Sequence, residues 1–182
     1  TENRREEGLM MEAPMLDNLA LVALPKYARR TVPRFVDQAR LLEAAGALAD
    51  SLRIRSGPIQ RHTTKNLSGG NQQKVVIGKW LMTDPAVFIM DEPTRGIDIG
   101  AKYDVYALIN DLAARGTAIL CISSELEELV GICDRILVMG NGEIRGEFSR
   151  EEFDETAILR AAFGEADPGE RETAVAKGKS DT

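Results

Sequence analysis

Two strings decide the fold, LSGGNQQK (67–74) and VFIMDEPT (87–94). Ser68 takes the N-cap position ahead of a helix predicted from about Gly69 to Met82, because a serine side chain can accept a hydrogen bond from the first helical turn. Residues 86–90 form a continuous apolar run, which predicts a strand buried on both faces. The two strings therefore predict a capped helix, and after it a buried strand that ends in two carboxylates.

The glycines that follow Ser68 suggest a chemical role for this helix start. Gly69 and Gly70 leave backbone N–H groups uncovered, and both the serine hydroxyl and the helix dipole favour an anion there. A phosphate group could bind at such a position. A capped loop without a ligand accounts for the same three residues, so both interpretations stay open.

Asp91 and Glu92 stand at the carboxyl end of the predicted strand. In open α/β sheets, ligands collect at the carboxyl ends of the strands. One carboxylate there can hold Mg²⁺ through water, and a second can orient or deprotonate an attacking water. The alternative is that the two acids are only a solvated loop end.

The remaining segments are assigned from periodicity, helix caps and turn residues. Before the string at 67–74 we predict a helix from Val32 to Leu52, with Pro33 in its first turn, and a polar connector over 59–66. After the first strand we predict a helix over 99–115 capped by Asp98, a second buried strand over 118–122 and a short helix over 125–130. The last predicted elements are a hairpin of strands 135–139 and 143–148 that turns at 140–142, a helix over 149–163 capped by Ser149, and a disordered tail over 165–182. This order predicts an α/β domain with a parallel sheet, and a separate helical section before Leu67.

Composition and charge narrow the class of protein. The 182 residues are 43% apolar and 29% charged, with a formal net charge of −6. Such a chain is typical of a globular domain, and its acidity disfavours non-specific binding to nucleic acid. No apolar run approaches the roughly 20 residues that a transmembrane helix needs. Cys121 is interpreted as a small buried hydrophobe, and His62, the only histidine, as an exposed bystander.

Four segments, taken in order, resemble the motifs of the ATP-binding cassette (ABC) family. They are the signature at 67–71, a Walker B strand with its glutamate at 87–92, a D-loop at 96–98 and a switch strand at 121–125. Longer strings are similar to the second cassette of bacterial monosaccharide importers of the ribose, xylose and galactose kind, at 2–9, 91–102, 122–128 and 134–139. The resemblance covers residues 1–163. It implies the C-terminal part of a P-loop NTPase-type nucleotide-binding domain with a helical subdomain.

In that family two cassettes close head to tail on two ATP molecules. The resemblance implies that Ser68, Gly69 and Gly70 bind the ATP of the partner cassette, with Asn71 and Gln72 nearby. We predict a division into a first part with the helical subdomain (1–66), a signature helix and α/β core (67–148), a C-terminal helix (149–163) and a disordered tail (164–182). The tail is assigned from its polar, charged composition. In the family the helical subdomain touches a membrane permease.

The carboxylates would serve the ATP of this cassette itself. By the resemblance, Asp91 holds Mg²⁺ through water, and Glu92 polarises the water that attacks the γ-phosphate. Asp98 would couple the two ATP sites through the interface between the cassettes.

The chain departs from the family pattern in three ways. No Gly-x-x-x-x-Gly-Lys-Ser/Thr string occurs, so the phosphate-cradling Walker A loop is absent from these residues. The switch histidine falls on Ser124, which is shorter and has no cationic donor. The glutamine that contacts metal and permease falls on Glu2. Because the chain also begins with Thr1 in mid-pattern, we expect it to be a piece of a longer protein and to hydrolyse ATP poorly alone.

The sequence therefore predicts an ATP- and Mg²⁺-dependent ATPase of a bacterial sugar importer, at the cytoplasmic face of the cell membrane. Its expected partners are a second cassette, a permease and, indirectly, a sugar-binding protein, with no nucleic acid. The alternative is a non-hydrolysing module that supplies Ser68 to a partner, which Ser124 favours and Glu92 opposes. A cassette that acts on DNA or ribosomes is disfavoured, because the chain has no long coiled-coil insertion, zinc cysteines or strongly basic segment.

Overall fold

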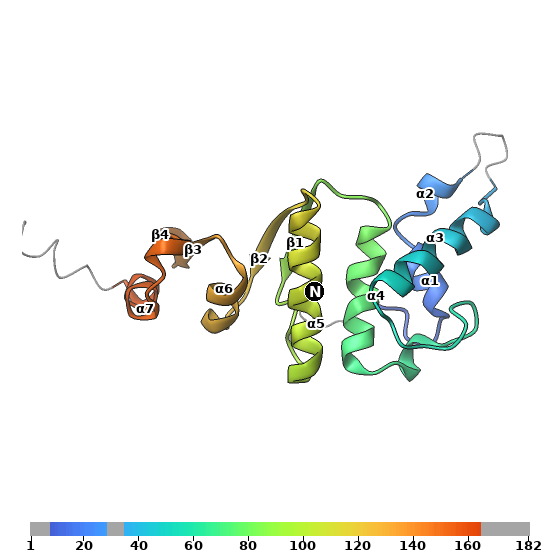
Figure 1. The fold of residues 1–182 in the computed structure, drawn as a ribbon, viewed down its shortest axis with the longest axis horizontal. Coiled ribbons are helices and arrows are strands. Elements are labelled where there is room, and N and C mark those ends of the chain that lie inside the picture. Colours follow the sequence, from blue (N-terminus) through green and yellow to red (C-terminus); the bar gives the residue numbers. More distant parts are fainter. Residues whose placement is uncertain (1–7, 29–34, 165–182) are drawn as a thin grey trace, which may run out of the picture. The chain divides into compact units, whose positions relative to one another are not determined.

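The computed structural model describes residues 8–28 and 35–164, and their contacts divide the chain into two compact units. The first unit ends at Ile122 and the second begins at Ser123. Glu2, Pro33 and the tail 165–182 lie outside the described residues, so the predictions made for them stay predictions. Figure 1 shows the helices and strands of both units, coloured along the sequence.

The first unit opens with helices α1 (Met15–Ala20), α2 (Leu24–Tyr27) and α3 (Gln38–Ser51). Their apolar faces form a core together with part of helix α4 (Gly69–Leu81), and its most deeply buried members are Met15, Leu19, Ala45 and Val75. Asn18 is buried beside this core, where its amide donates to Thr64 Oγ1 at 2.9 Å and to the Met10 carbonyl at 3.0 Å. One polar side chain therefore holds two segments that are far apart in the sequence.

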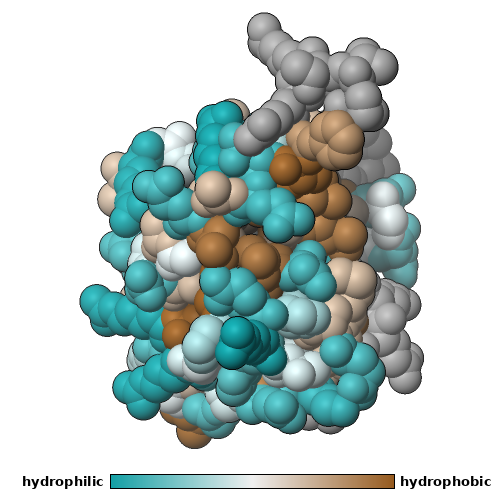
Figure 2. Space-filling model, turned by 90° about the vertical axis from the view of Figure 1, so that its right-hand side faces the viewer, coloured by the Kyte–Doolittle hydropathy of each residue, from teal (hydrophilic) through white to brown (hydrophobic). Residues whose placement is uncertain are grey.

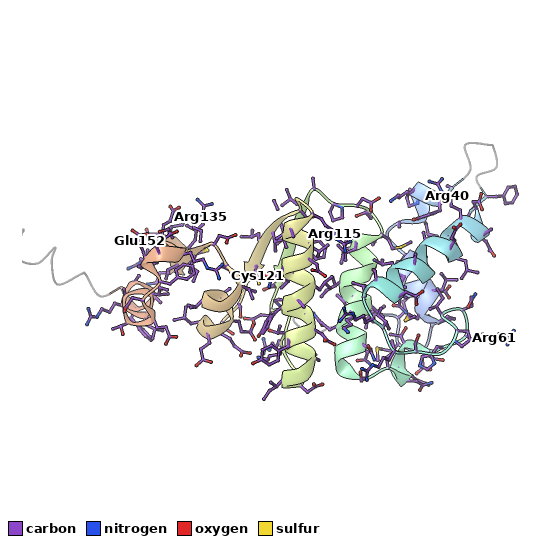
Figure 3. The ribbon with its side chains drawn as sticks, viewed as in Figure 1. Arg40, Arg61, Arg115, Cys121, Arg135 and Glu152 are labelled. Atoms are coloured by element: carbon purple, nitrogen blue, oxygen red, sulfur yellow. The ribbon has the colours of Figure 1, made fainter. Side chains whose placement is uncertain are left out.

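Helix α3 starts later than the sequence predicts. The periodic pattern indicates a helix from Val32, but the structure begins it at Gln38, where the Asp37 side chain accepts a hydrogen bond from the Arg40 N–H at 3.2 Å. The residues just before it are extended instead, because the Asp37 N–H donates to the Tyr27 carbonyl at 2.9 Å. Arg40, labelled in Figure 3, has its guanidinium carbon 5.6 Å from the centroid of the Tyr27 ring.

Helix α4 leads into strand β1 (Val87–Asp91), helix α5 (Ile99–Ala114) and strand β2 (Ala118–Ile122). The two strands pair in parallel, with Val87 opposite Ala118 and Asp91 opposite Ile122. Helix α5 is the crossover connection, and α4 packs beside it (Figure 1). The predicted α/β arrangement with a parallel sheet is confirmed.

The prediction that both strands are buried on two faces is wrong. In β1, Phe88 and Met90 are buried, but Val87 is 60% exposed and Ile89 is 63% exposed. Side chains alternate between the faces of a strand, so this pattern means that only one face is covered in the described residues. Cys121 on β2 (Figure 3) is half-buried rather than buried, for the same reason.

The second unit contains α6 (Leu126–Ile132) and the antiparallel strands β3 (Arg135–Gly140) and β4 (Glu143–Ser149). The predicted hairpin is confirmed. Asn141 and Gly142 have φ values of 53° and 83°, the left-handed backbone that a two-residue turn of this kind requires. Ile136, Val138 and Ile158 form a small core in this unit.

The predicted helix over 149–163 is in fact two elements, the short 3₁₀ helix η3 (Arg150–Glu152) and helix α7 (Glu155–Phe163). Ser149 and Glu152 form a capping box at the start of η3. Asp154 then caps α7 by accepting a hydrogen bond from the Ala157 N–H at 2.7 Å. The pattern misled because two acidic residues after a cap fit the first turn of one long helix equally well. In neither of the described parts, 8–28 and 35–164, is any helix long and apolar enough to span a bilayer.

Candidate functional site

Ser68 caps the helix that carries the signature string, as the sequence predicts. Its backbone is extended, with φ −61° and ψ 158°, and its hydroxyl oxygen accepts a hydrogen bond from the Asn71 N–H at 3.4 Å. The Ser68 side chain is exposed, and Gly69 beside it is partly exposed. The helix start therefore presents a hydroxyl and backbone N–H groups to solvent.

Gly70 is buried and has a packing role that the sequence did not reveal. A Cβ at this position would lie 2.5 Å from the Cβ of Ala101, in the first turn of α5. The absence of a side chain lets the two helix starts approach each other, which is one of the structural uses of glycine.

Asn71 bonds to the backbone of the loop that follows α3. Its Oδ1 accepts from the Arg55 N–H and its Nδ2 donates to the Arg55 carbonyl, each at 3.3 Å. The side-chain amide thus pairs with the Arg55 backbone as a neighbouring strand would. Arg55 was not among the predicted site residues, since nothing in the string 53–57 indicates a backbone partner.

Gln72 is 2% exposed, so it does not face solvent near the helix start. Its Nε2 donates to the Leu67 carbonyl at 3.1 Å and to the Thr64 carbonyl at 3.4 Å. Gln72 therefore holds the connector ahead of the signature string, a role that no feature of the sequence indicates.

Lys74 ties the signature helix to α5. Its ammonium group is buried and donates to Asp104 Oδ2 at 2.8 Å and to the Arg53 carbonyl at 3.5 Å. The hydrogen bond from Lys74 lowers the pKa of the Asp104 carboxyl below its ordinary value. Asn71 and Lys74 are three residues apart and share one helical face. This spacing is the one sequence signal that they act on the same loop.

The paired carboxylates follow β1, as predicted, and they differ in environment. Asp91 is exposed and Glu92 is half-buried. Glu92 has a φ of 47°, in the left-handed region, and its N–H donates to the Ile122 carbonyl at 2.8 Å. Pro93 and Thr94 after it are buried. The backbone on both sides of Glu92 is thus anchored while its side chain stays accessible.

Asp98 caps α5 by accepting a hydrogen bond from the Ala101 N–H at 2.9 Å. Ala101 is also the residue that Gly70 approaches. The structure therefore brings two of the predicted site segments, the signature start and the Asp98 loop, to the first turn of one helix.

Ser124 belongs to the second unit and is exposed there. Its neighbour Ser123 accepts a hydrogen bond from the Glu125 N–H at 3.0 Å, which shapes the turn into α6. Glu92 belongs to the first unit. The pairing of Ser124 with Glu92 in one site therefore stays a prediction.

Comparison with known proteins decides the family. A sequence profile described as ABC transporter matches residues 4–95, which is half of the chain and includes both the signature string and the paired carboxylates. The chain belongs to the ABC transporter family.

Curated relatives of this ABC chain include sugar-import proteins. It is 47% identical over 163 residues to the xylose import ATP-binding protein XylG of Moorella thermoacetica, a match that covers 90% of the chain and 31% of the relative. It is 45% identical over 162 residues to the ribose import ATP-binding protein RbsA 1 of Rubrobacter xylanophilus, covering 89% of the chain and 32% of the relative. The chain spans about a third of the length of these relatives.

Solved structures of the family have the same fold. The crystal structure of the ADP conformation of MJ1267, an ATP-binding cassette of an ABC transporter, matches with a TM-score of 0.64 and 27% identity, over 91% of this chain and 64% of that one. A nucleotide-free ATP-binding cassette matches with a TM-score of 0.65 and 26% identity, over 88% of this chain and 62% of that one.

The family implies that Mg²⁺ binds with the nucleotide, and the residues of this chain suit a water-mediated contact to it. Among the described residues, no three or more His, Cys, Asp and Glu side chains gather into a group that could hold a metal ion. Mg²⁺ in nucleotide sites keeps several waters and takes one or two carboxylates besides the phosphates. An exposed Asp91 at a strand end suits such a water-mediated contact.

Proposed function

We propose that this chain is part of the ATP-binding subunit of a bacterial monosaccharide importer and that it couples ATP binding and hydrolysis to sugar uptake. The observation that carries the proposal is the 47% identity to a xylose import ATP-binding protein over 90% of the chain. The ribose import protein adds a second relative of the same kind. The sugar would be chosen by the binding protein and the permease, as the resemblance to such importers implies.

The signature start would act on ATP that a partner cassette holds. Ser68 and Gly69 present a hydroxyl and backbone N–H groups at the positive end of a 13-residue helix, which favours a phosphate. Gly70 contributes by letting this helix start lie against α5. A partner cassette with its own Walker A loop would supply the other half of that site.

The carboxylates would act on the ATP of this cassette. When bound, ATP would supply the phosphoryl group and Mg²⁺ would neutralise its charge. Asp91 would bind the Mg²⁺ through water, and Glu92 would accept a hydrogen bond from the attacking water and take its proton. The anchored backbone around Glu92 supports this role, since a base must be held at a set position to orient water. Glu2 would be a further contact to the metal, as the family resemblance implies.

The two ATP sites would communicate through Asp98. Its carboxylate caps α5, and α5 is the helix against which the signature start packs. A shift of the Asp98 loop at the interface between cassettes would therefore reach the signature start through one turn of helix.

The permease is proposed to dock on the helical part of the first unit, at the cytoplasmic face of the membrane. A groove of about 520 Å³ lies there, between α1, α2 and α3, and its walls are mostly apolar. Figure 2 shows hydrophobic residues gathered on this side of the molecule, with hydrophilic ones around them. The sugar-binding protein would contact the permease rather than this chain.

A second candidate function rests on Ser124. A serine supplies no cationic donor where the family has histidine, so charge that develops on the phosphate would be stabilised less. This chain could then hold nucleotide without hydrolysing it and serve its partner only through Ser68.

One substitution separates the two candidates. Glu92→Gln in the full-length protein should reduce ATP turnover at least about 100-fold if Glu92 is the general base. Glu151→Gln, at an exposed glutamate of η3, is the matched control and should leave turnover unchanged. Equal turnover in the Glu92 variant and the wild type would support the non-hydrolysing module. The importer class is tested by uptake of labelled pentoses and hexoses into cells, and uptake of none would contradict it.

A further inference from the structure

We propose that Asn71 is a positioning residue, which fixes the end of α3 to the signature start, and not a nucleotide ligand. This inference rests on the proposed function, because it assigns a residue of the same ATP-using site. It departs from the sequence-based expectation that Asn71 lies near the ATP of the partner cassette.

The side-chain amide of Asn71 bonds through both its oxygen and its nitrogen. Asn71 Oδ1 accepts from the Arg55 N–H and Asn71 Nδ2 donates to the Arg55 carbonyl. Both ends of the amide are thus engaged with one backbone residue. Rotating the side chain toward a nucleotide would break both bonds, and water would take its place on the exposed backbone groups of Arg55.

Arg55 lies just after the end of α3. Helix α3 ends in a tight turn in which Arg53 has a φ of 51° and the Ile54 N–H donates to the Ala49 carbonyl at 3.0 Å. This is a left-handed helix end of the Schellman kind. Arg55 follows directly, so Asn71 binds the chain four residues beyond Ser51, the last residue of α3.

Lys74 reinforces the contact of Asn71 with Arg55 from the same face of α4. Its ammonium group donates to the Arg53 carbonyl at 3.5 Å and to Asp104 Oδ2 at 2.8 Å. The loop after α3 is thus held at two points by the signature helix, and Lys74 joins that helix to α5. A displacement of α3 would be transmitted to Ser68, three residues before Asn71 on the same helix start.

The contact of Asn71 with Arg55 is tested in the full-length protein with three variants. Asn71→Ala removes both bonds, whereas Asn71→Asp keeps the acceptor for the Arg55 N–H and loses the donor. Asn66→Ala is the matched control, since Asn66 is an exposed amide on the connector next to the signature string. Two quantities are measured for each variant. They are amide hydrogen exchange of short peptides that contain Arg55, without nucleotide, and the steady-state kinetics of ATP turnover.

We expect Asn71→Ala to speed exchange at Arg55 about tenfold, as local opening becomes easier. Its kcat should fall about 10- to 100-fold, because a misplacement of about 1 Å costs that much in a positioned site. The KM for ATP should change less than about threefold, because a positioning residue does not touch the nucleotide. Asn71→Asp should lie between the wild type and the alanine variant, and it carries the test if Asn71→Ala does not fold.

Three results would overturn the proposal. They are unchanged exchange at Arg55 in Asn71→Ala, faster exchange with turnover equal to that of Asn66→Ala, and a raised KM with unchanged kcat. The last would make Asn71 a nucleotide contact. If the wild-type protein shows no ATP turnover, the proposed function fails by itself, and the exchange measurement still decides whether Asn71 holds Arg55.

Discussion

Gly70 approaches Ala101 so closely that a methyl group on the glycine would lie 2.5 Å from the Cβ of Ala101. Real Cβ contacts are never this short, so the backbones of α4 and α5 would have to separate to admit one. Asp98 caps α5 at the same Ala101. The signature start and the Asp98 loop are thus positioned by one contact between two helices, and this relationship leads to the first prediction.

Gly70→Ala should destabilise the protein by about 1–3 kcal/mol, the usual cost of overpacking. ATP turnover should fall as well, because the signature start is pushed away from α5. Thermal or urea unfolding and steady-state turnover measure the two effects. Gly46→Ala in α3 is the control, since its Cβ would meet no atom within 4 Å, and it should be neutral or stabilising by up to about 1 kcal/mol. Adding Ala101→Gly should restore part of the loss, and no restoration would contradict the contact.

Gln72→Glu should lower the free energy of unfolding by at least about 2 kcal/mol. The buried amide donates to two carbonyl groups, and a carboxylate there would place an acceptor against acceptors. Urea unfolding gives the measurement. Gln60→Glu, at an exposed position of the connector, should change stability little. A variant as stable as the Gln60 control would show that Gln72 does not hold the connector.

Asp104→Asn should make the protein less stable at neutral pH than the wild type. The hydrogen bond from Lys74 lowers the pKa of Asp104 in the folded protein. The bond therefore stabilises the fold fully above the ordinary aspartate pKa of about 3.9. This stabilisation is lost as the pH falls through the lower pKa of the folded state. The difference between wild type and variant should therefore shrink below about pH 4. Unfolding curves measured from pH 3 to pH 8 test this, with exposed Asp111→Asn on the same helix expected to parallel the wild type.

Asp98→Ala and Asp154→Ala should each cost about 1 kcal/mol of stability, because each aspartate caps a helix through one N–H of its first turn. Only the Asp98 substitution should also reduce ATP turnover, since only Asp98 is assigned to the interface between cassettes. Asp98→Ser should recover the cap but not the turnover. Equal turnover in all three variants would remove Asp98 from the proposed coupling.

Elements whose signals are local can be predicted from the amino-acid sequence. Ser68 and Asp98 were identified as helix caps because their side chains bond within their own first turns. The turn at Asn141 and Gly142 was predicted because few residues adopt a left-handed backbone readily. The family resemblance also followed from the spacing of short strings, and the profile match confirms it.

The side chains that hold the site together become visible only in the folded structure. Asn71 and Gln72 look alike in the string, yet one binds the backbone of Arg55 and the other is buried against the connector. These roles depend on where α3 ends and on how the connector folds back, and neither leaves a periodic pattern. The sequence predicts that Val87 and Ile89 are buried, but both are exposed in the structure. An apolar run does not show which face of a sheet is covered. Local hydrogen bonds are therefore readable from the chain, whereas contacts between distant segments depend on the packing of the whole unit.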